Sequence, residues 1–74
     1  MKERDFEKLI YKSINKKIKN LKKFEWDSLA QLSILMNLEK KFPNKITSIK
    51  KISEITNYND LLKALKKNKI IIDD

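Results

Sequence analysis

Apolar residues recur along the N-terminal part of the chain at helical spacing. Residues 3–19 carry an apolar residue at every third or fourth position, with lysines on the opposite face. This period is typical of a helix that buries one stripe and exposes the other face to water. The stripe consists of Phe6, Leu9, Ile10, Ile14 and Ile18. The pattern predicts a first helix over residues 3–19.

A second, wider apolar face begins after Asp27 and ends before Pro43. It consists of Leu29, Leu32, Leu35, Met36, Leu38 and Phe42. Asp27 suits the N-cap position, where its carboxylate accepts hydrogen bonds from the free amides of the first turn. Pro43 ends the helix because a proline pushes the residue before it out of the helical conformation. We therefore expect a second helix over residues 27–42.

The segment that follows Pro43 has a strict three-residue repeat. The repeat consists of Ile46, Ile49, Ile52 and Ile55. A step of three favours a short, tight helical turn over a strand, whose step is two. We expect a short third helix over residues 48–54.

The last helix is predicted over residues 57–67. It begins at Asn57, a capping residue that is followed three positions later by the acid Asp60. The tail, residues 68–74, contains the apolar run Ile70–Ile72. This run either docks on the helices or forms an association-prone end.

Length and composition limit the fold and its chemistry. The 74 residues make one domain (1–74) near the lower size limit for unaided folding. We expect an all-α fold, a small four-helix bundle with three main helices and one short third helix. The chain has no Cys, His or Gly, so we expect no metal site, no glycine-rich phosphate loop and no enzymatic activity. Without a signal peptide or a membrane-spanning run, a cytoplasmic monomer is expected.

The net charge of +8 is unevenly distributed. Residues 1–24 carry an excess of six positive charges, residues 43–74 an excess of three, and residues 25–42 a net charge of −1. Seventeen of the eighteen basic residues are lysines, although arginine is the better bidentate ligand of phosphates and base edges. We interpret most of the charge as a solvated surface and expect no nucleic-acid partner.

The segment around Ser28 resembles a family signature. Residues 26–42 read WDSLAQLSILMNLEKKF, with a serine at the helix start and an L-E-x-x-F run at its end. Together with the order of the predicted helices, this is similar to the acyl carrier protein family over residues 5–66. The resemblance implies that Ser28 carries a covalent 4'-phosphopantetheine arm. It also implies that Asp27 caps the helix beside it and that Leu29 contacts partner enzymes.

The resemblance implies a carrier that holds an acyl or aminoacyl group as a thioester on the arm. Its partners would be a phosphopantetheinyl transferase and acyl- or aminoacyl-activating and transferring enzymes of lipid or secondary-metabolite biosynthesis. The cargo would lie in an apolar cleft between the second and third helices. The candidates for lining this cleft are Ile34, Leu38, Ile46, Ile55 and Leu62, and an ordinary core explains the same residues equally well.

The surface predicted around Ser28 departs from that of the family, whose familiar members are acidic. Here Ala30, Ser33, Lys40 and Lys41 occupy several positions where acids often stand. Charge complementarity governs association rate and partner choice, so we expect a dedicated set of partner enzymes.

Two alternatives to the carrier stay open. The first is a carrier-like helical adaptor that is not modified. The second is a basic helical module that binds nucleic acid or an anionic membrane. Its binding face would consist of Lys8, Lys12, Lys16, Lys19 and Lys23.

Overall fold

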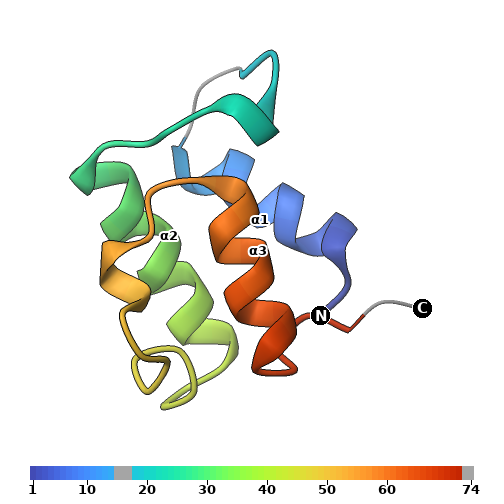
Figure 1. Cartoon of the computed structure of the whole chain (residues 1–74), viewed down its shortest axis with the longest axis vertical. Helices are drawn as coiled ribbons and strands as arrows, with labels where there is room; N and C mark the ends of the chain where they lie inside the picture. The colour runs from blue at the N-terminus through green and yellow to red at the C-terminus, as the bar shows by residue number, and fades with distance from the viewer. Residues whose placement is uncertain (15–17, 73–74) are drawn as a thin grey trace.

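The computed structural model describes residues 1–14 and 18–72 (Figure 1). Within these residues, three α-helices and two short 3-10 turns follow one another. They are α1 (Glu3–Ile14), η1 (Leu21–Lys23), α2 (Ser28–Lys41), η2 (Ile52–Glu54) and α3 (Tyr58–Lys67). The expected all-helical fold is confirmed: the described residues contain no strand, only a single antiparallel bridge between Glu25 and Asn57. None of the helices in this part of the chain is long and apolar enough to cross a membrane.

The bounds of α2 and α3 lie within one residue of those predicted. Asp27 is the N-cap of α2 and Phe42 its C-cap, while Asn57 is the N-cap of α3. Each N-cap side chain accepts a hydrogen bond from the amide three residues later, which satisfies a donor that the helix leaves free. Local capping chemistry therefore sets where these two helices begin.

The first helix is shorter than predicted. We expected residues 3–19, but α1 ends at Ile14 and residues 18–20 are not helical, with residues 15–17 outside the described part. The reason lies in the connection to α2, where Leu21 is buried in the core and η1 packs against α3. The chain has to leave the helical path before Leu21 in order to turn back over the core.

The expected short third helix over residues 48–54 is present only as the 3-10 turn η2, and the expected four-helix bundle is not confirmed. Only η2 is helical there, and it is a single 3-10 turn. The three-residue repeat forms successive tight turns, as its step predicted. The amides of Ile49, Ile52 and Ile55 each donate to the carbonyl three residues earlier, at 3.1, 3.2 and 3.3 Å. Lys51 has a left-handed backbone (φ 62°) that interrupts a regular helix.

The N-terminus lies beside residues 70–72, which follow α3 (Figure 1). The Met1 ammonium donates to the Ile70 carbonyl at 2.9 Å, and the Ile72 amide donates to the Met1 carbonyl at 2.9 Å. Ile70 and Ile71 are buried in the core, whereas Ile72 is exposed. Of the two possibilities for the tail, the structure shows docking on the helices for Ile70 and Ile71. Residues 73–74 lie outside the described part.

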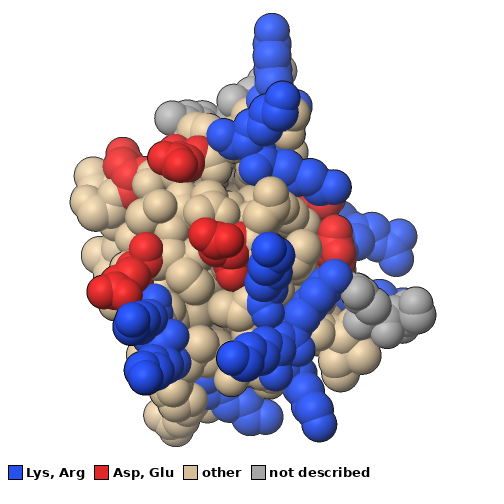
Figure 2. All heavy atoms as spheres, in the orientation of Figure 1, with Lys and Arg blue, Asp and Glu red and all other residues tan. Residues whose placement is uncertain are grey.

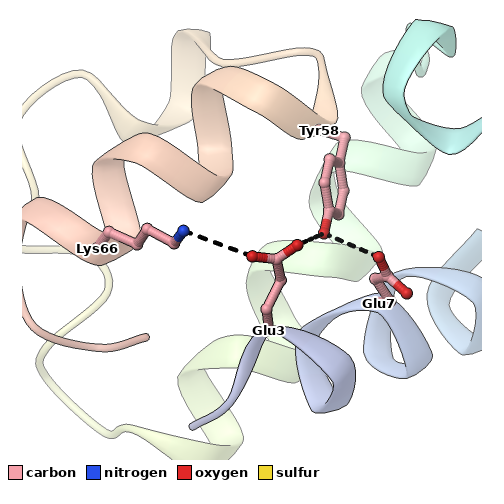
Figure 3. Close-up of polar contacts among 4 residues, drawn as sticks. All are labelled: Glu3, Glu7, Tyr58 and Lys66. Atoms are coloured by element: carbon pink, nitrogen blue, oxygen red, sulfur yellow. Dashed lines mark hydrogen bonds and ion pairs between the residues drawn. The ribbon is translucent and has the colours of Figure 1, made fainter. Parts of the chain in front are cut away.

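Tyr58, the first residue of α3, anchors this helix on α1. Its fully buried ring stacks on Phe6 with the ring centroids 5.3 Å apart. Its hydroxyl lies 3.3 Å from Oε1 of Glu7 and 3.5 Å from Oε2 of Glu3, and Glu3 also pairs with Lys66 on α3 (Figure 3). Burial, followed by the negative charges of Glu7 and Glu3, raises the pKa of Tyr58 well above its usual value.

This raised pKa predicts a loss of stability in alkali. Above about pH 10, the ordinary pKa of tyrosine, the unfolded chain has lost the Tyr58 proton while the folded chain keeps it, so the free energy of unfolding falls. Tyr58→Phe removes that contribution, and its stability should decline less steeply with pH. At neutral pH the variant should lose roughly 1 kcal/mol or less, since both hydrogen bonds are long.

The measurement is urea unfolding at a series of pH values, followed by the fluorescence of Trp26, the only tryptophan. Tyr11→Phe, at the partly exposed tyrosine of α1, is the matched control. If the free energy of unfolding declined equally steeply with pH in Tyr58→Phe and Tyr11→Phe, the assignment of this pH dependence to Tyr58 would be contradicted.

Candidate functional site

Ser28 is the first residue of α2 and is exposed. Asp27, in extended backbone before it, accepts a hydrogen bond from the Ala30 amide at 2.8 Å through Oδ1. Among the described residues, none is hydrogen-bonded to the Ser28 hydroxyl. The hydroxyl therefore stands free at a capped helix N-terminus, where unpaired amides and the helix dipole favour an anion by about 0.3–1 kcal/mol.

The segment before Ser28 is held against the start of α3. The Trp26 amide donates to the Thr56 carbonyl at 3.0 Å, and Glu25 forms the isolated bridge with Asn57. The Trp26 side chain is 4% exposed and belongs to the core, with its indole N–H unpaired within the described part of the chain. These contacts fix the direction from which the backbone enters α2 and make the position of Ser28 rigid.

An apolar stripe extends from Ser28 along one exposed face of α2. It consists of Leu29, Leu32 and Met36, which are 75%, 57% and 55% exposed. Their spacing of three and four residues places them on one side of the helix. Leu29 is therefore not a core residue, although it belongs to the apolar face predicted from the sequence. The sequence pattern placed Leu32 and Met36 on the same wide apolar face as the core residue Leu38. The width of that face was the signal that part of it stays exposed.

Glu39 has a structural role at the other end of α2. Its Oε1 accepts a hydrogen bond from the Asn44 amide at 2.7 Å, while Oε2 is buried without a partner within the described residues. The contact holds the turn after Pro43, where Asn44 has a left-handed backbone (φ 65°). Glu39 is the only acid of α2, so this helix presents no free carboxylate to a partner.

The distribution of charge over the surface agrees with this description of α2. On the face shown in Figure 2, Lys and Arg side chains project from the top, right and lower edges, whereas acidic and neutral atoms cover the upper left, over the entry into α2. Of the lysines proposed as a basic face, Lys8, Lys12, Lys19 and Lys23 are exposed, and Lys16 lies outside the described residues.

The five residues proposed to line a cargo cleft lie in or against the core. Ile34, Leu38 and Ile46 are at most 1% exposed, and Ile55 and Leu62 are partly buried against them. Gln31 of α2 also bonds to the Ser53 carbonyl of η2, which ties these elements together. In this structure the five residues contribute to packing, and their part in a cleft stays a prediction.

Two hollows lie between α1 and α2, one near each end of α2. The serine-side hollow, about 370 Å³, is bounded by Asp27, Leu29 and Ala30 together with Ser13 and Phe24. The other hollow, about 300 Å³, lies near the end of α2. Lysines from both α1 and α2 line it, and we call it the lysine hollow.

Sequence reasoning missed both hollows because periodicity does not show which helices pack together. A signal was present on α2. Small or polar side chains stand at Ala30, Ser33 and Asn37, at helical spacing beside the apolar positions, and all three border a hollow. As for metals, no group of three or more Asp, Glu, His or Cys within residues 1–14 and 18–72 could hold an ion.

The cap at Asp27 can be tested by substitution. Asp27→Ala should lower the free energy of unfolding by about 1 kcal/mol, because the Ala30 amide loses its acceptor. Asp27→Asn keeps a side-chain acceptor and should lose only a few tenths of a kcal/mol. Urea unfolding followed by circular dichroism measures both. An equal loss in the two variants would show that charge, and not the capping hydrogen bond, stabilises the start of α2.

Comparisons of the chain with models of protein families, with curated proteins and with solved structures found no match in any of the three. A functional assignment therefore depends on the residues and geometry around Ser28.

Proposed function

We propose that this protein is a carrier whose Ser28 is modified with 4'-phosphopantetheine and which presents a thioester-bound acyl or aminoacyl group to partner enzymes. The observation that supports this most is the free, exposed Ser28 hydroxyl at the capped start of α2. It coincides with the segment WDSLAQLSILMNLEKKF, which resembles the acyl carrier signature. The bound arm would supply the thiol that the chain, without cysteine, lacks.

The residues present fit the attachment of a phosphodiester. The helix N-terminus favours the negative phosphate, and Ser28 is accessible to a second protein. In the attachment step the Ser28 oxygen forms a bond to the phosphorus that bears pantetheine, and coenzyme A loses 3',5'-ADP. Asp27 caps the helix by accepting from the Ala30 amide, and we assign the base that takes the Ser28 proton to the transferase.

The apolar stripe is the surface that we assign to partner enzymes. It begins beside Ser28, so an enzyme that contacts Leu29, Leu32 and Met36 also reaches the attachment point. Because Glu39 is engaged with Asn44, recognition at this face depends on apolar contact more than on complementary charge. We therefore expect a dedicated set of partner enzymes.

The unmodified adaptor remains the second candidate, and the same stripe supports it. Exposed apolar residues that line up on one face mark interaction sites whether or not a neighbouring serine is modified. Modification of Ser28 is the property that separates the two functions.

Modification is tested by the intact mass after incubation with coenzyme A, Mg²⁺ and a phosphopantetheinyl transferase. We expect the mass to increase by one phosphopantetheine. Ser28→Ala should show no increase, and Ser53→Ala, at another exposed serine, should be modified like the original chain. An unchanged mass with several transferases, or an increase that persists in Ser28→Ala, would overturn the carrier assignment.

The apolar stripe is tested separately in the modifiable protein. The double variant Leu32→Gln and Met36→Gln should slow transfer of the arm to Ser28 about tenfold, which corresponds to about 1.4 kcal/mol of lost contact. Its free energy of unfolding should change by less than roughly 0.5 kcal/mol, because both side chains are exposed. Ile72→Gln, at an exposed apolar residue outside α2, is the control. Equal rates for the double variant and the control would exclude the stripe as the docking surface.

A further inference from the structure

Four exposed lysines from two helices line the lysine hollow between α1 and α2. Two come from successive turns of α1 and two from the last turn of α2, and the hollow has a volume of about 300 Å³. The buried side chain of Leu9 lies beneath them. The four lysines are Lys8, Lys12, Lys40 and Lys41.

The positive charge of this hollow is largely uncompensated. In the part of the chain that the structure describes, Asp5 is the only acid that lines the hollow, and none of the four lysines forms an ion pair. Like charges one turn apart, such as Lys8 and Lys12, repel each other and destabilise a helix slightly. Lys66 on α3 differs, because it pairs with Glu3 at 3.4 Å. An anion placed among the four lysines would relieve their repulsion.

The walls of the hollow are already fixed by protein contacts. Nδ2 of Asn37 on α2 donates to the Ser13 hydroxyl on α1 at 2.7 Å, and that hydroxyl donates to the Leu9 carbonyl at 2.7 Å. Asn37 borders the lysine hollow, and Ser13 borders the serine-side hollow. The hydrogen bond therefore joins α1 and α2 between the two hollows, and a ligand would not have to bring the helices together.

We infer that the lysine hollow binds a small multivalent oxyanion, a group with phosphate or carboxylate charges of about the size of pyrophosphate or a dicarboxylate. Its volume is at the lower end of the range for small-molecule sites, and its recognising groups are lysines. Lysine acts as a point charge and not as a planar fork. Binding should therefore depend on the charge of the anion more than on its shape, and should weaken as salt is added.

The anion has two possible sources. One is a free anion in solution, and this binding does not require modification of Ser28. The other is the anionic end of a cargo carried on Ser28, which rests on the proposed carrier function. Ser28 and Lys40 are about 18 Å apart along the axis of α2, at about 1.5 Å per residue. The serine-side hollow lies along the same seam between α1 and α2.

The test uses the unmodified, ¹⁵N-labelled protein titrated with pyrophosphate at constant ionic strength, and reads amide chemical shifts. We expect saturable shifts confined to residues that line the hollow, such as Leu9, Lys12 and Asn37. Lys12→Gln combined with Lys40→Gln should weaken binding about tenfold by removing two of the charges that line the hollow.

The matched control is Lys63→Gln combined with Lys67→Gln. It removes the same charge from exposed positions of α3 and should change the affinity by less than about twofold, because only distant and screened charge is lost. Shifts that do not saturate, or equal weakening in the two double variants, would overturn the site in favour of diffuse attraction to a basic surface.

A second experiment distinguishes the sources in protein modified at Ser28. If the anion is the end of the cargo, loading with a succinyl group should change the amide chemical shifts of the residues that line the lysine hollow. Loading with a neutral butyryl group should leave these shifts unchanged. Identical spectra for the two cargoes, with saturable pyrophosphate binding, assign the site to a free anion. Failure to modify Ser28 leaves the pyrophosphate titration valid, so the two proposals fail separately.

Discussion

The stacking of Tyr58 on Phe6 places the start of α3 on α1, and the position of Ser28 follows from that contact. Tyr58 is the first residue of α3, directly after the cap Asn57, so its burial fixes the backbone of residues 56 and 57. The Thr56 carbonyl accepts a hydrogen bond from the Trp26 amide, and Asn57 forms the bridge with Glu25. The chain is thereby held two residues before the serine. A contact between the first and last helices thus determines the geometry of the candidate site.

A small core makes the exposed apolar stripe of α2 notable. With no disulfide, the 74 residues depend on burial of apolar side chains for stability. Full burial of a Leu or Met side chain contributes about 1.5–3 kcal/mol, and domains are stable by only about 5–15 kcal/mol. Leaving Leu29, Leu32 and Met36 exposed therefore forgoes a large share of the possible stability. A surface role next to Ser28 explains that arrangement better than the fold alone does.

The sequence predicted the elements that local chemistry controls. Asp27, Asn57 and Pro43 set the ends of α2 and the start of α3 through capping and backbone restriction, which act over a few residues. The end of α1 was predicted wrongly because a distant contact decides it, and the helical part of residues 48–54 is shorter than predicted because the backbone at Lys51 interrupts it. Leu21 has to reach the core, and Lys51 takes a left-handed conformation in a chain without glycine.

The candidate site divides in the same way. Ser28 and its cap could be found from sequence because they form one short motif. The role of Glu39 could not, because its partner is the backbone amide of Asn44 in a turn that follows Pro43. The lysine hollow could not be found either, because Lys8 and Lys12 meet Lys40 and Lys41 only when α1 packs against α2. The net charge alone suggested that positive charge is spread over the surface. The fold brings four of the lysines together around one hollow.

The apolar stripe and the seam with α1 are neighbouring but distinct faces of α2. At about 100° per residue, Ala30, Ser33 and Asn37 lie roughly a quarter turn around the helix from Leu29, Leu32 and Met36. The two faces meet at Leu29, which belongs to the stripe and also borders the serine-side hollow, and they separate towards the end of α2. Ser28 lies at the end where the two faces begin. Under the proposed function, an enzyme that docks on Leu32 and Met36 leaves Asn37, Lys40 and Lys41 uncovered, so that partner contact and anion binding depend on different side chains towards the end of one helix.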